Sequence, residues 1–366
     1  MAAQLFPGTA LGTLLIAELS SNGCIKETKV YGFVKKYTFA AMVFSALWLF
    51  SAAALFTRVF SLSDVVYCAV PFYVFGTAVF IMTAYLSYFG DFIIPALYSL
   101  ISSALVPLMV YAAPDMTPGS YALMISFGSV VSALLIFSRA ARRSPPDSSE
   151  CVSLPFSRIA KSYIPMTMAG VFIPAGALML SFFSRGGGNA VAFGFCVRLI
   201  FALVAAFSFG FSRVLYPEFS RDGKAQLSHS FVRALRSCGL LILLFTPVIA
   251  AVFIKGETVF STFFMRGRFD ENAVALLARA FRGAVFSVPA LCVCEIMSKL
   301  CFACGIKWAP GVCNIIGIAV TFFMLLGFSG ADIVMPAASF SVGAAVSALL
   351  LTVSIYMISR KEARAG

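Results

Sequence analysis

The sequence predicts an all-α polytopic membrane protein made of two pseudo-symmetric helical lobes that repeat one another in parallel. Two observations carry this prediction. Hydrophobic residues make up 61% of the 366-residue chain and charged residues only 11%, whereas a soluble domain has about a quarter of its residues charged. The apolar runs are long enough for membrane helices, roughly 20 residues each, and too long for the alternating strands of a β-barrel. The second observation is an internal repeat.

The repeat is visible at two offsets. LLIAELSSNG recurs 200 positions later as VLYPEFSRDG, and three further residues recur 215 positions later. We expect the 15 added residues to lie in the loop around RGRFDENAV, because loops tolerate insertions. Two copies of one multi-helix unit are typical of membrane transporters, with a substrate site between the halves. The matched residues are Leu15, Glu18, Ser20 and Gly23 with Leu215, Glu218, Ser220 and Gly223, and then Met82, Gly90 and Pro95 with Met297, Gly305 and Pro310.

The apolar runs predict about ten full spans and a short N-terminal half-helix. The first lobe, residues 1–138, has runs at 5–19, 34–57, 65–89, 93–113 and 119–138. A hydrophilic stretch rich in Pro, Ser and Arg defines a linker at 139–157. The second lobe, residues 158–358, has runs at 160–183, 190–217, 233–254, 273–300, 308–328 and 332–358, and a tail follows at 359–366.

The spacing of the repeat also predicts a missing piece. The second copy has two helices before VLYPEFSRDG, while the first has only half a helix before LLIAELSSNG. The first copy therefore lacks its first one and a half helices, either because the gene model starts late or because the protein is truncated. A complete copy has six helices. An even number returns the chain to its starting side, so the copies are parallel about an axis along the membrane normal.

Positive charges lie between the spans and predict the orientation. The net charge is +12, and alternating spans place all four basic regions on one side. The positive-inside rule makes that side cytoplasmic, with the C-terminus on it, and anionic phospholipids are the expected partners there. This distribution argues against binding to nucleic acid. The four regions contain Lys26, Lys29, Lys35 and Lys36; Arg139, Arg142, Arg143, Arg158 and Lys161; Arg213, Arg221, Lys224, Arg233 and Arg236; and Arg360, Lys361 and Arg364.

Three segments resemble the MurJ/MviN lipid II flippases of the multidrug/oligosaccharidyl-lipid/polysaccharide exporter (MOP) superfamily. LLIAELSSNG resembles the exit of the family's second helix, RVLYPEFSR that of its eighth, and VFSTFFMRGRFDENAVALLARAF its aromatic and basic loop with the following helix. The resemblance runs from Phe6 to about Met357. It implies a multi-pass protein of the bacterial inner membrane, with two six-helix lobes and a final helix pair that forms a lipid-tail groove. Relative to that pattern, this chain is truncated at both ends.

The resemblance implies a transporter that flips the lipid-linked peptidoglycan precursor, lipid II, by alternating access. An exporter of another polyprenyl-linked polysaccharide or a drug stays open as an alternative, because two acidic positions of the family are Val197 and Phe201 here. A non-transporting remnant is a further alternative, because several diphosphate-binding arginines of the family fall in the absent N-terminal part. No enzyme, metal or cofactor is predicted, since no catalytic set occurs and GGGN at 186–189, expected to be a loop, is not followed by G-K-[ST].

Arg198 is the predicted substrate-binding residue. We expect it about midway along the second helix of the second lobe, far from either end, where an arginine costs several kcal/mol unless it faces a cavity, a partner or an anionic ligand. Its fork of donors matches a phosphate bidentately, and its position matches a cavity-lining arginine of the family. We therefore expect it to hold the substrate's diphosphate in a cavity between the lobes. The alternative is that Arg198 extends to the membrane interface.

Four other charged residues are candidates for ion pairing or gating. Glu295 and Lys299 have the i, i+4 spacing of an intrahelical ion pair, for which self-neutralisation is favoured over a proton or sodium relay. Glu18 and Glu218 recur at helix exits, where we expect turns that face headgroups. Most of the ten cysteines lie in apolar runs, which favours packing over metal or redox chemistry. Prolines inside the runs are predicted bending points: Pro71, Pro165, Pro174, Pro247 and Pro289.

Overall fold

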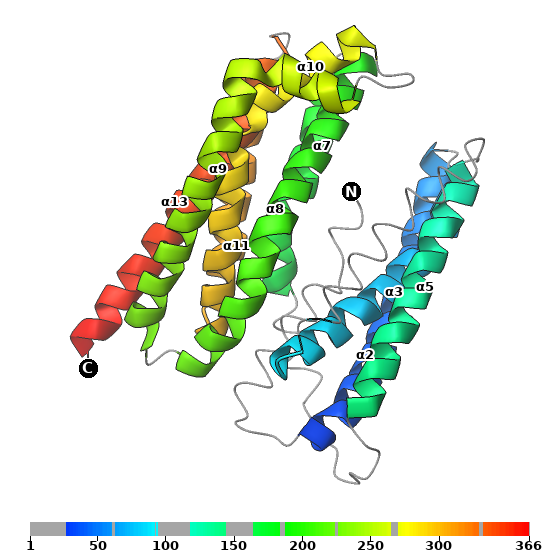
Figure 1. Ribbon diagram of the computed structural model, residues 1–366, viewed down its shortest axis with the longest axis vertical. Coiled ribbons are helices and arrows are strands. Elements are labelled where there is room, and N and C mark those ends of the chain that lie inside the picture. The colour runs from blue at the N-terminus through cyan, green and yellow to red at the C-terminus, as the bar shows by residue number, and fades with distance from the viewer. Residues whose placement is uncertain are drawn as a thin grey trace. The chain divides into compact units, whose positions relative to one another are not determined.

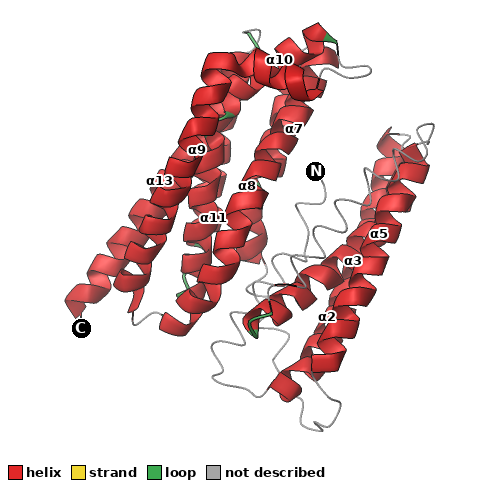
Figure 2. Ribbon diagram, viewed as in Figure 1, coloured by secondary structure: helices red, strands yellow, loops and turns green. Residues whose placement is uncertain are grey.

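The computed structural model describes residues 27–60, 63–91, 93, 118–143, 164–183, 187–223, 226–264, 270–328 and 332–365. These residues are helical apart from turns and short connections, which confirms the all-α prediction (Figure 2). The predicted half-helix at 5–19 with Glu18, nearly all of the span at 93–113, and residues 144–157 of the linker lie outside the described residues. The chain forms two compact units, within Phe6–Tyr163 and within Ile164–Gly366, here called the first and second lobes.

In the first lobe, α3 (Ser63–Tyr88) packs against both α2 (Glu27–Phe60) and α5 (Pro118–Arg143). A serine side chain of α5 bridges two backbone groups of α3 beside Pro71. The Ser126 hydroxyl donates to the Cys68 carbonyl at 2.7 Å and accepts from the Phe72 N–H at 3.2 Å. It thus stands between the two groups that an uninterrupted helix would bond directly. The first five residues of the predicted linker, 139–143, belong to α5.

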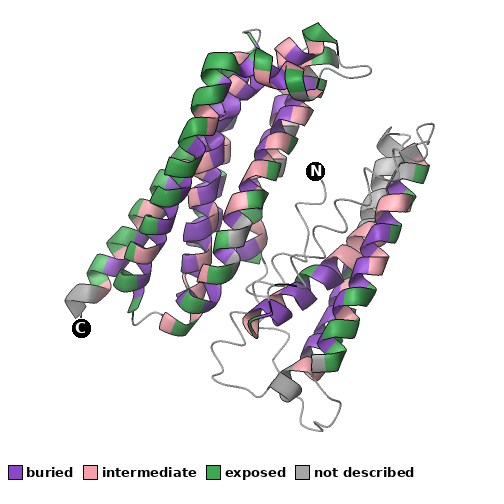
Figure 3. Ribbon diagram, in the orientation of Figure 1, coloured by how far each residue is buried: buried purple, intermediate pink, exposed green. Residues whose placement is uncertain are grey.

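The second lobe contains seven named helices, of which α8, α9, α11 and α13 run side by side while α10 lies across one end of them (Figure 1). Figure 3 shows exposed residues along much of α9 and α13, whereas the inner sides of the helices are buried. A helical stretch at residues 164–170 precedes the first named helix. The helices are α7 (Phe172–Phe183), α8 (Gly187–Asp222), α9 (Leu227–Phe264), α10 (Glu271–Ala284), α11 (Ser287–Ala303), α12 (Ala309–Gly327) and α13 (Val334–Ala365).

Several helices are longer than the apolar runs predicted. The 36 residues of α8 correspond to about 54 Å at about 1.5 Å per residue, whereas the hydrocarbon core is about 30 Å thick. Its candidate membrane window is only Val191–Ser208, so the remaining residues continue the helix beyond that window. Likewise α13 continues through the predicted tail to Ala365. The expected GGGN loop is also wrong for its last three residues, since α8 begins at Gly187.

The predicted span at 273–300 is not one continuous helix, because it contains α10 and α11, which are bent by 48° to one another. Pro289 has no N–H to bond the Val285 carbonyl, and the ladder is interrupted there. The residues ENAV were expected to be a loop but form the first turn of α10. Asp270 caps this helix by accepting from the Ala273 N–H at 2.8 Å. By the 215-residue offset, the first residue of α3, Ser63, corresponds to Ala278, so the 15-residue insertion lies before Ala278 and contains only the first half of α10.

By length and composition, six described helices can cross a membrane, or seven if α10 and α11 form one bent span. This establishes a multi-pass membrane protein for the described part of the chain. It is also compatible with the predicted ten spans, because several predicted spans lie wholly or partly outside the described residues.

The internal repeat recurs as local structure. Gly90 and Gly305 both adopt positive φ, +82° and +79°, and both close the helix before them by the same hydrogen-bond pattern, a Schellman cap. Met82 and Met297 are both fully buried. The bonds join the N–H groups of Phe89, Gly90 and Asp91 to the carbonyls of Tyr85, Ser87 and Leu86, and those of Cys304, Gly305 and Ile306 to Leu300, Phe302 and Cys301. Every pair differs by 215, the offset found in the sequence.

The crossing of α12 and α13 gives a stability prediction. A Cβ atom at Gly343 would lie 2.5 Å from the Gly317 carbonyl oxygen, so Gly343→Ala should destabilise the second lobe by about 1–3 kcal/mol. Gly239→Ala on α9 is the matched control, because a Cβ there meets nothing within 4 Å. Thermal unfolding in detergent should show a lower midpoint for Gly343→Ala alone. Equal midpoints would contradict the close helix contact.

Candidate functional site

Arg198 lies on α8, eleven residues after Gly187 and in the middle of the apolar window Val191–Ser208. We expected it midway along the whole helix, and this was wrong because α8 extends so far beyond its apolar part. The two residues before it differ from it in exposure. Cys196 and Val197 are buried in the core of the second lobe, whereas the Arg198 side chain is exposed.

The exposed face of α8 around Arg198 has a simple composition. Val191, Ala202 and Ala206 are also exposed, and their spacing of four and seven residues puts them on the same side of the helix. The guanidinium lies over the Phe195 ring, 5.7 Å from its centroid, a cation–π contact that leaves its N–H fork available. Within the described residues, Arg198 makes no ion pair. The geometry is therefore a partly stacked arginine on an uncovered apolar face.

Glu218 and its neighbours form a charged cluster where α8 and α9 meet. Arg233 Nη1 lies 2.9 Å from Glu218 Oε2 and 3.8 Å from Asp222 Oδ2, and Ser230 Oγ donates to Asp222 at 2.8 Å. Glu218 was expected in a turn, but α8 continues past it to Asp222, and the turn falls at Gly223. The cluster joins two consecutive helices at one end of the lobe. This arrangement is a structural tie.

Glu295 and Lys299 lie one turn apart on α11, with 3.4 Å between Oε1 and Nζ. The Lys299 ammonium is also 5.8 Å from the centre of the Tyr216 ring on α8. Both charged side chains are about one-fifth to one-quarter exposed. Arg198, Glu218 and Glu295 thus have different neighbours among the described residues, and no hydrogen bond or ion pair there joins the three into one site.

Sequence reasoning missed two buried polar contacts. In the first lobe, Arg139 Nε lies 3.2 Å from Asp91 Oδ2, whose side chain is 7% exposed. In the second lobe, the Asn314 amide donates to the Ala169 carbonyl at 2.5 Å and accepts from Ser347. Asn314 and Ser347 carry no charge, and only the interruption of the helix at Val171 creates a carbonyl for Asn314 to bond. The available sequence signal for this interruption was Pro174, which has no N–H to bond the Gly170 carbonyl.

Metal chemistry finds no support in the described part of the chain, where no group of three His, Cys, Asp or Glu side chains could hold an ion. None of the eight described cysteines forms a disulfide, and seven of them are buried. Two of them also donate hydrogen bonds, Cys294 to Ser347 Oγ at 3.7 Å and Cys304 to the Gly223 carbonyl at 3.6 Å.

The fold is that of the MOP-superfamily transporters. A MATE transporter solved in complex with MaL6 has a TM-score of 0.78 at 13% identity, covering 99% of this chain and 86% of that one. A MOP transporter from Pyrococcus furiosus gives 0.78 at 12%, covering 99% and 85%. A mutant of the Vibrio cholerae MATE transporter VcmN gives 0.72 at 13%, covering 100% and 85%. No curated protein matches the sequence.

The particular family follows from the sequence itself. The profile of the lipid II flippase MurJ family matches residues 9–366, and the chain belongs to this family. The family is one of transporters, and its activity is the flipping of lipid II.

The charged cluster of α8 and α9 can be tested by paired substitution. Arg233 is about one-third exposed, so Arg233→Gln should lower the free energy of unfolding by no more than about 1 kcal/mol. Glu218→Gln should add little once Arg233 is gone, because the two act as a pair. Arg236→Gln is the control, because Arg236 is the next arginine on the same helix and has no ion pair among the described residues. A double-mutant cycle from thermal unfolding measures this. Strict additivity would contradict the pairing.

Proposed function

We propose that this chain flips lipid II across the bacterial inner membrane by alternating access, with Arg198 binding the diphosphate. The observation that carries the proposal is an exposed arginine in the middle of an apolar membrane window. A guanidinium facing hydrocarbon there would be costly, whereas an anionic ligand in a water-accessible cavity would stabilise it. Membership of the MurJ family supports the choice of lipid II as that ligand.

The chemistry of Arg198 suits a diphosphate. Its planar guanidinium offers parallel N–H donors that match two phosphate oxygens at once. The Phe195 ring beneath it restricts the side chain while leaving that fork free. The other exposed residues of this face are small or apolar, so they leave room for a bulky headgroup and contribute no competing charge.

Transport needs two lobes that change their mutual arrangement. We propose that the repeats, divided at the linker 139–157, act as these two bodies, and that they are parallel copies about an axis along the membrane normal. The tie between α8 and α9, the pair Glu295–Lys299 and the residue Glu18 are proposed gating elements in this movement. The driving force would come from an ion gradient or the membrane potential.

A second candidate is export of another polyprenyl-linked saccharide. Val197, where the family often has an acidic residue, is 2% exposed, so this position faces the lobe core and carries no charge. Phe201 is likewise neutral. The charge beside Arg198 therefore differs from the family pattern, and the substrate's headgroup could differ with it.

Lipid II binding by Arg198 variants tests the leading proposal. Arg198→Ala should weaken binding to the purified protein roughly 10- to 100-fold, the effect of losing hydrogen bonds to a charged group. Arg198→Lys should restore only part of it, because a point charge lacks the fork. Arg221→Ala, an exposed arginine of α8 outside the apolar window, is the charge-matched control. Native mass spectrometry gives the affinities.

The outcomes separate the two candidates. Unchanged lipid II affinity in Arg198→Ala, with membrane insertion intact, would contradict the assignment of Arg198. Strong binding of an undecaprenyl-diphosphate oligosaccharide without the peptide, together with weak binding of lipid II, would favour the second candidate.

The orientation makes a separate prediction. We expect the C-terminus in the cytoplasm, because the basic regions then all lie inside. A green fluorescent protein fused after Gly366 should fluoresce, and an alkaline phosphatase fusion there should be inactive. The reverse pattern would overturn the orientation.

A further inference from the structure

Gly194 lies one turn before Arg198 on α8, inside the apolar window Val191–Ser208. Residues four apart on a helix share one face, and a helical side chain leans towards the N-terminal end of its helix. The contact of Arg198 with Phe195, three residues before it, shows that the guanidinium leans this way. Gly194 and Phe195 therefore form the part of α8 over which the guanidinium is held.

These two residues differ in what they place beside the guanidinium. Phe195 is half-buried and packs against the hydrophobic core of the second lobe, which restrains its ring. Gly194 is also partly exposed, and a Cβ atom added there would meet no heavy atom within 4 Å. The guanidinium thus has an aromatic ring on one side and open space above the helix backbone on the other.

The second lobe itself does not require a glycine at this position. The backbone of Gly194 is helical, and no neighbouring helix approaches it. By contrast, a Cβ atom at Gly283, Gly317 or Gly343 would lie closer than 3.0 Å to a neighbouring helix. Glycine within a helix is less favourable than alanine, because it loses more conformational freedom on folding. The space at Gly194 therefore lowers the stability of α8 without serving the packing of the lobe.

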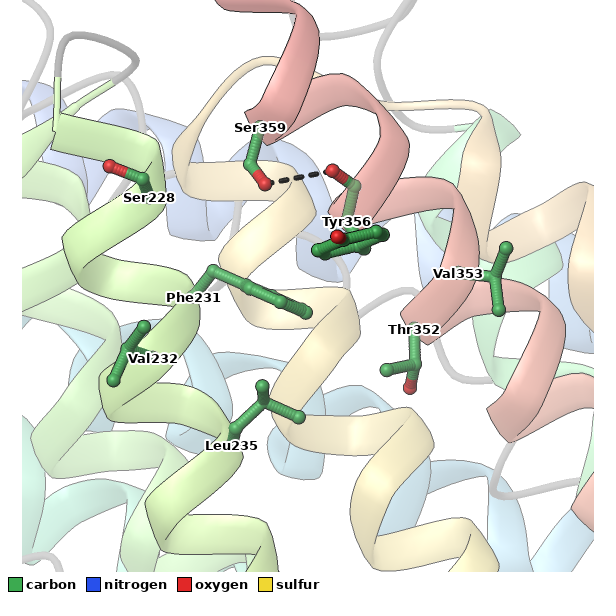
Figure 4. Close-up of a pocket in the computed structure, with 8 residues that line it drawn as sticks. All are labelled: Ser228, Phe231, Val232, Leu235, Thr352, Val353, Tyr356 and Ser359. Carbon is green, nitrogen blue, oxygen red and sulfur yellow. Dashed lines mark hydrogen bonds between the residues drawn. The ribbon is translucent and has the colours of Figure 1, made fainter. Parts of the chain in front are cut away.

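A groove between α9 and α13 differs from this turn of α8 in its chemistry. Figure 4 shows the eight side chains that line the groove, and the ring centres of Phe231 and Tyr356 there are 6.3 Å apart. No lining side chain is charged, and their polar groups are hydroxyls. The groove therefore offers an anion no charge to hold it, whereas open space and an arginine without an ion pair occur together at Gly194.

We propose that Gly194 is a specificity-determining residue of the diphosphate site. Its missing side chain leaves a recess in which the diphosphate lies against α8, while the fork of Arg198 holds its oxygens. A larger side chain at this position would keep the diphosphate away from the guanidinium, whereas glycine lets a bulky anion approach the helix backbone. This inference rests on the proposed function, because it concerns how Arg198 binds the lipid-linked diphosphate.

Binding by purified Gly194 variants tests the recess. The probes are lipid II and undecaprenyl diphosphate, because both candidate substrates contain a polyprenyl diphosphate, and native mass spectrometry gives the affinities. Gly194→Leu should weaken the binding of both probes roughly tenfold or more, the effect of losing hydrogen bonds to a charged group. Gly194→Ala should weaken it less, because one methyl group fills only part of the recess.

Gly239→Leu on α9 is the matched control. Gly239 is exposed within the candidate span Leu227–Thr262, and a Cβ atom there also meets nothing within 4 Å. It follows the exposed Arg236 by three residues instead of preceding it, so the arginine leans away from the glycine. Affinities for both probes should stay those of the unaltered protein.

Thermal unfolding in detergent separates a blocked recess from a folding defect. Leucine is a better helix former than glycine, and the space at Gly194 is open. The midpoint of Gly194→Leu should therefore be equal to or higher than that of the unaltered protein. A lower midpoint would mean that the lobe itself needs the glycine, and it would contradict the proposal.

Comparison with Arg198→Ala distinguishes this inference from the proposed function. Affinities lowered by Arg198→Ala but unchanged by Gly194→Leu would overturn the recess alone. Affinities unchanged in both variants, or binding of neither probe by the unaltered protein, would overturn the diphosphate site as well. In the Arg198→Ala background, Gly194→Leu should have little further effect, because the diphosphate is no longer held over this turn. Full additivity would mean that the leucine acts elsewhere, and it would also overturn the recess.

Discussion

The structure depends on one constraint, which is that backbone N–H and C=O groups in hydrocarbon must find partners within the protein. Three interruptions of the helices show how this is met. At Pro71 the Ser126 hydroxyl bridges the opened turn of α3. At the interruption at Val171, the Asn314 amide bonds the Ala169 carbonyl.

The third interruption, between α10 and α11, uses serine twice. The Gly283 carbonyl accepts from Ser341 of α13 at 2.9 Å, and the Ala284 carbonyl accepts from Ser287 at 2.6 Å. The Val285 carbonyl, which Pro289 cannot bond, accepts from the Val288 N–H at 3.1 Å. Small neutral polar residues therefore allow these helices to bend without leaving buried groups unbonded. These bends therefore need no charged side chain.

The placement of the charged residues relates the fold to the proposed function. Ion pairs that tie helices together lie where helices end, as between Arg139 and Asp91 or Arg233 and Glu218. Arg198 stands apart, because it lies within an apolar window and its face of α8 is uncovered by its own lobe. A charge in that position is expensive unless a ligand or a hydrated cavity compensates it.

The spans and the repeat could be predicted from the sequence because both leave a direct trace in residue order. The apolar runs predicted where α3, α5, α12 and α13 begin to within a few residues. The ends of the longer helices, such as residues 218–222 of α8 and 359–365 of α13, could not be found, since a helix outside the membrane needs no apolar run. The bend before Pro289 could be predicted from the proline itself. That two separate helices lie there could not, because hydropathy is continuous through the bend.

Less of the candidate site could be predicted from the sequence. Arg198 could be singled out because a charge within an apolar run is rare, but its exposure and its contact with Phe195 depend on how α8 is rotated in the lobe. Asn314 and Ser347 gave no signal at all. Their roles arise only when α12 and α13 bring them beside an interrupted helix.

The central claim is that this chain moves lipid II, and translocation in reconstituted vesicles tests it most directly. Fluorescent lipid II is incorporated in both leaflets, and a membrane-impermeant quencher reports the fraction that reaches the outer leaflet over time. With an imposed ion gradient or membrane potential, vesicles with the protein should expose lipid II faster than protein-free vesicles, while labelled phosphatidylcholine should remain equally slow in both. Lipid II movement no faster than in protein-free vesicles would contradict the account.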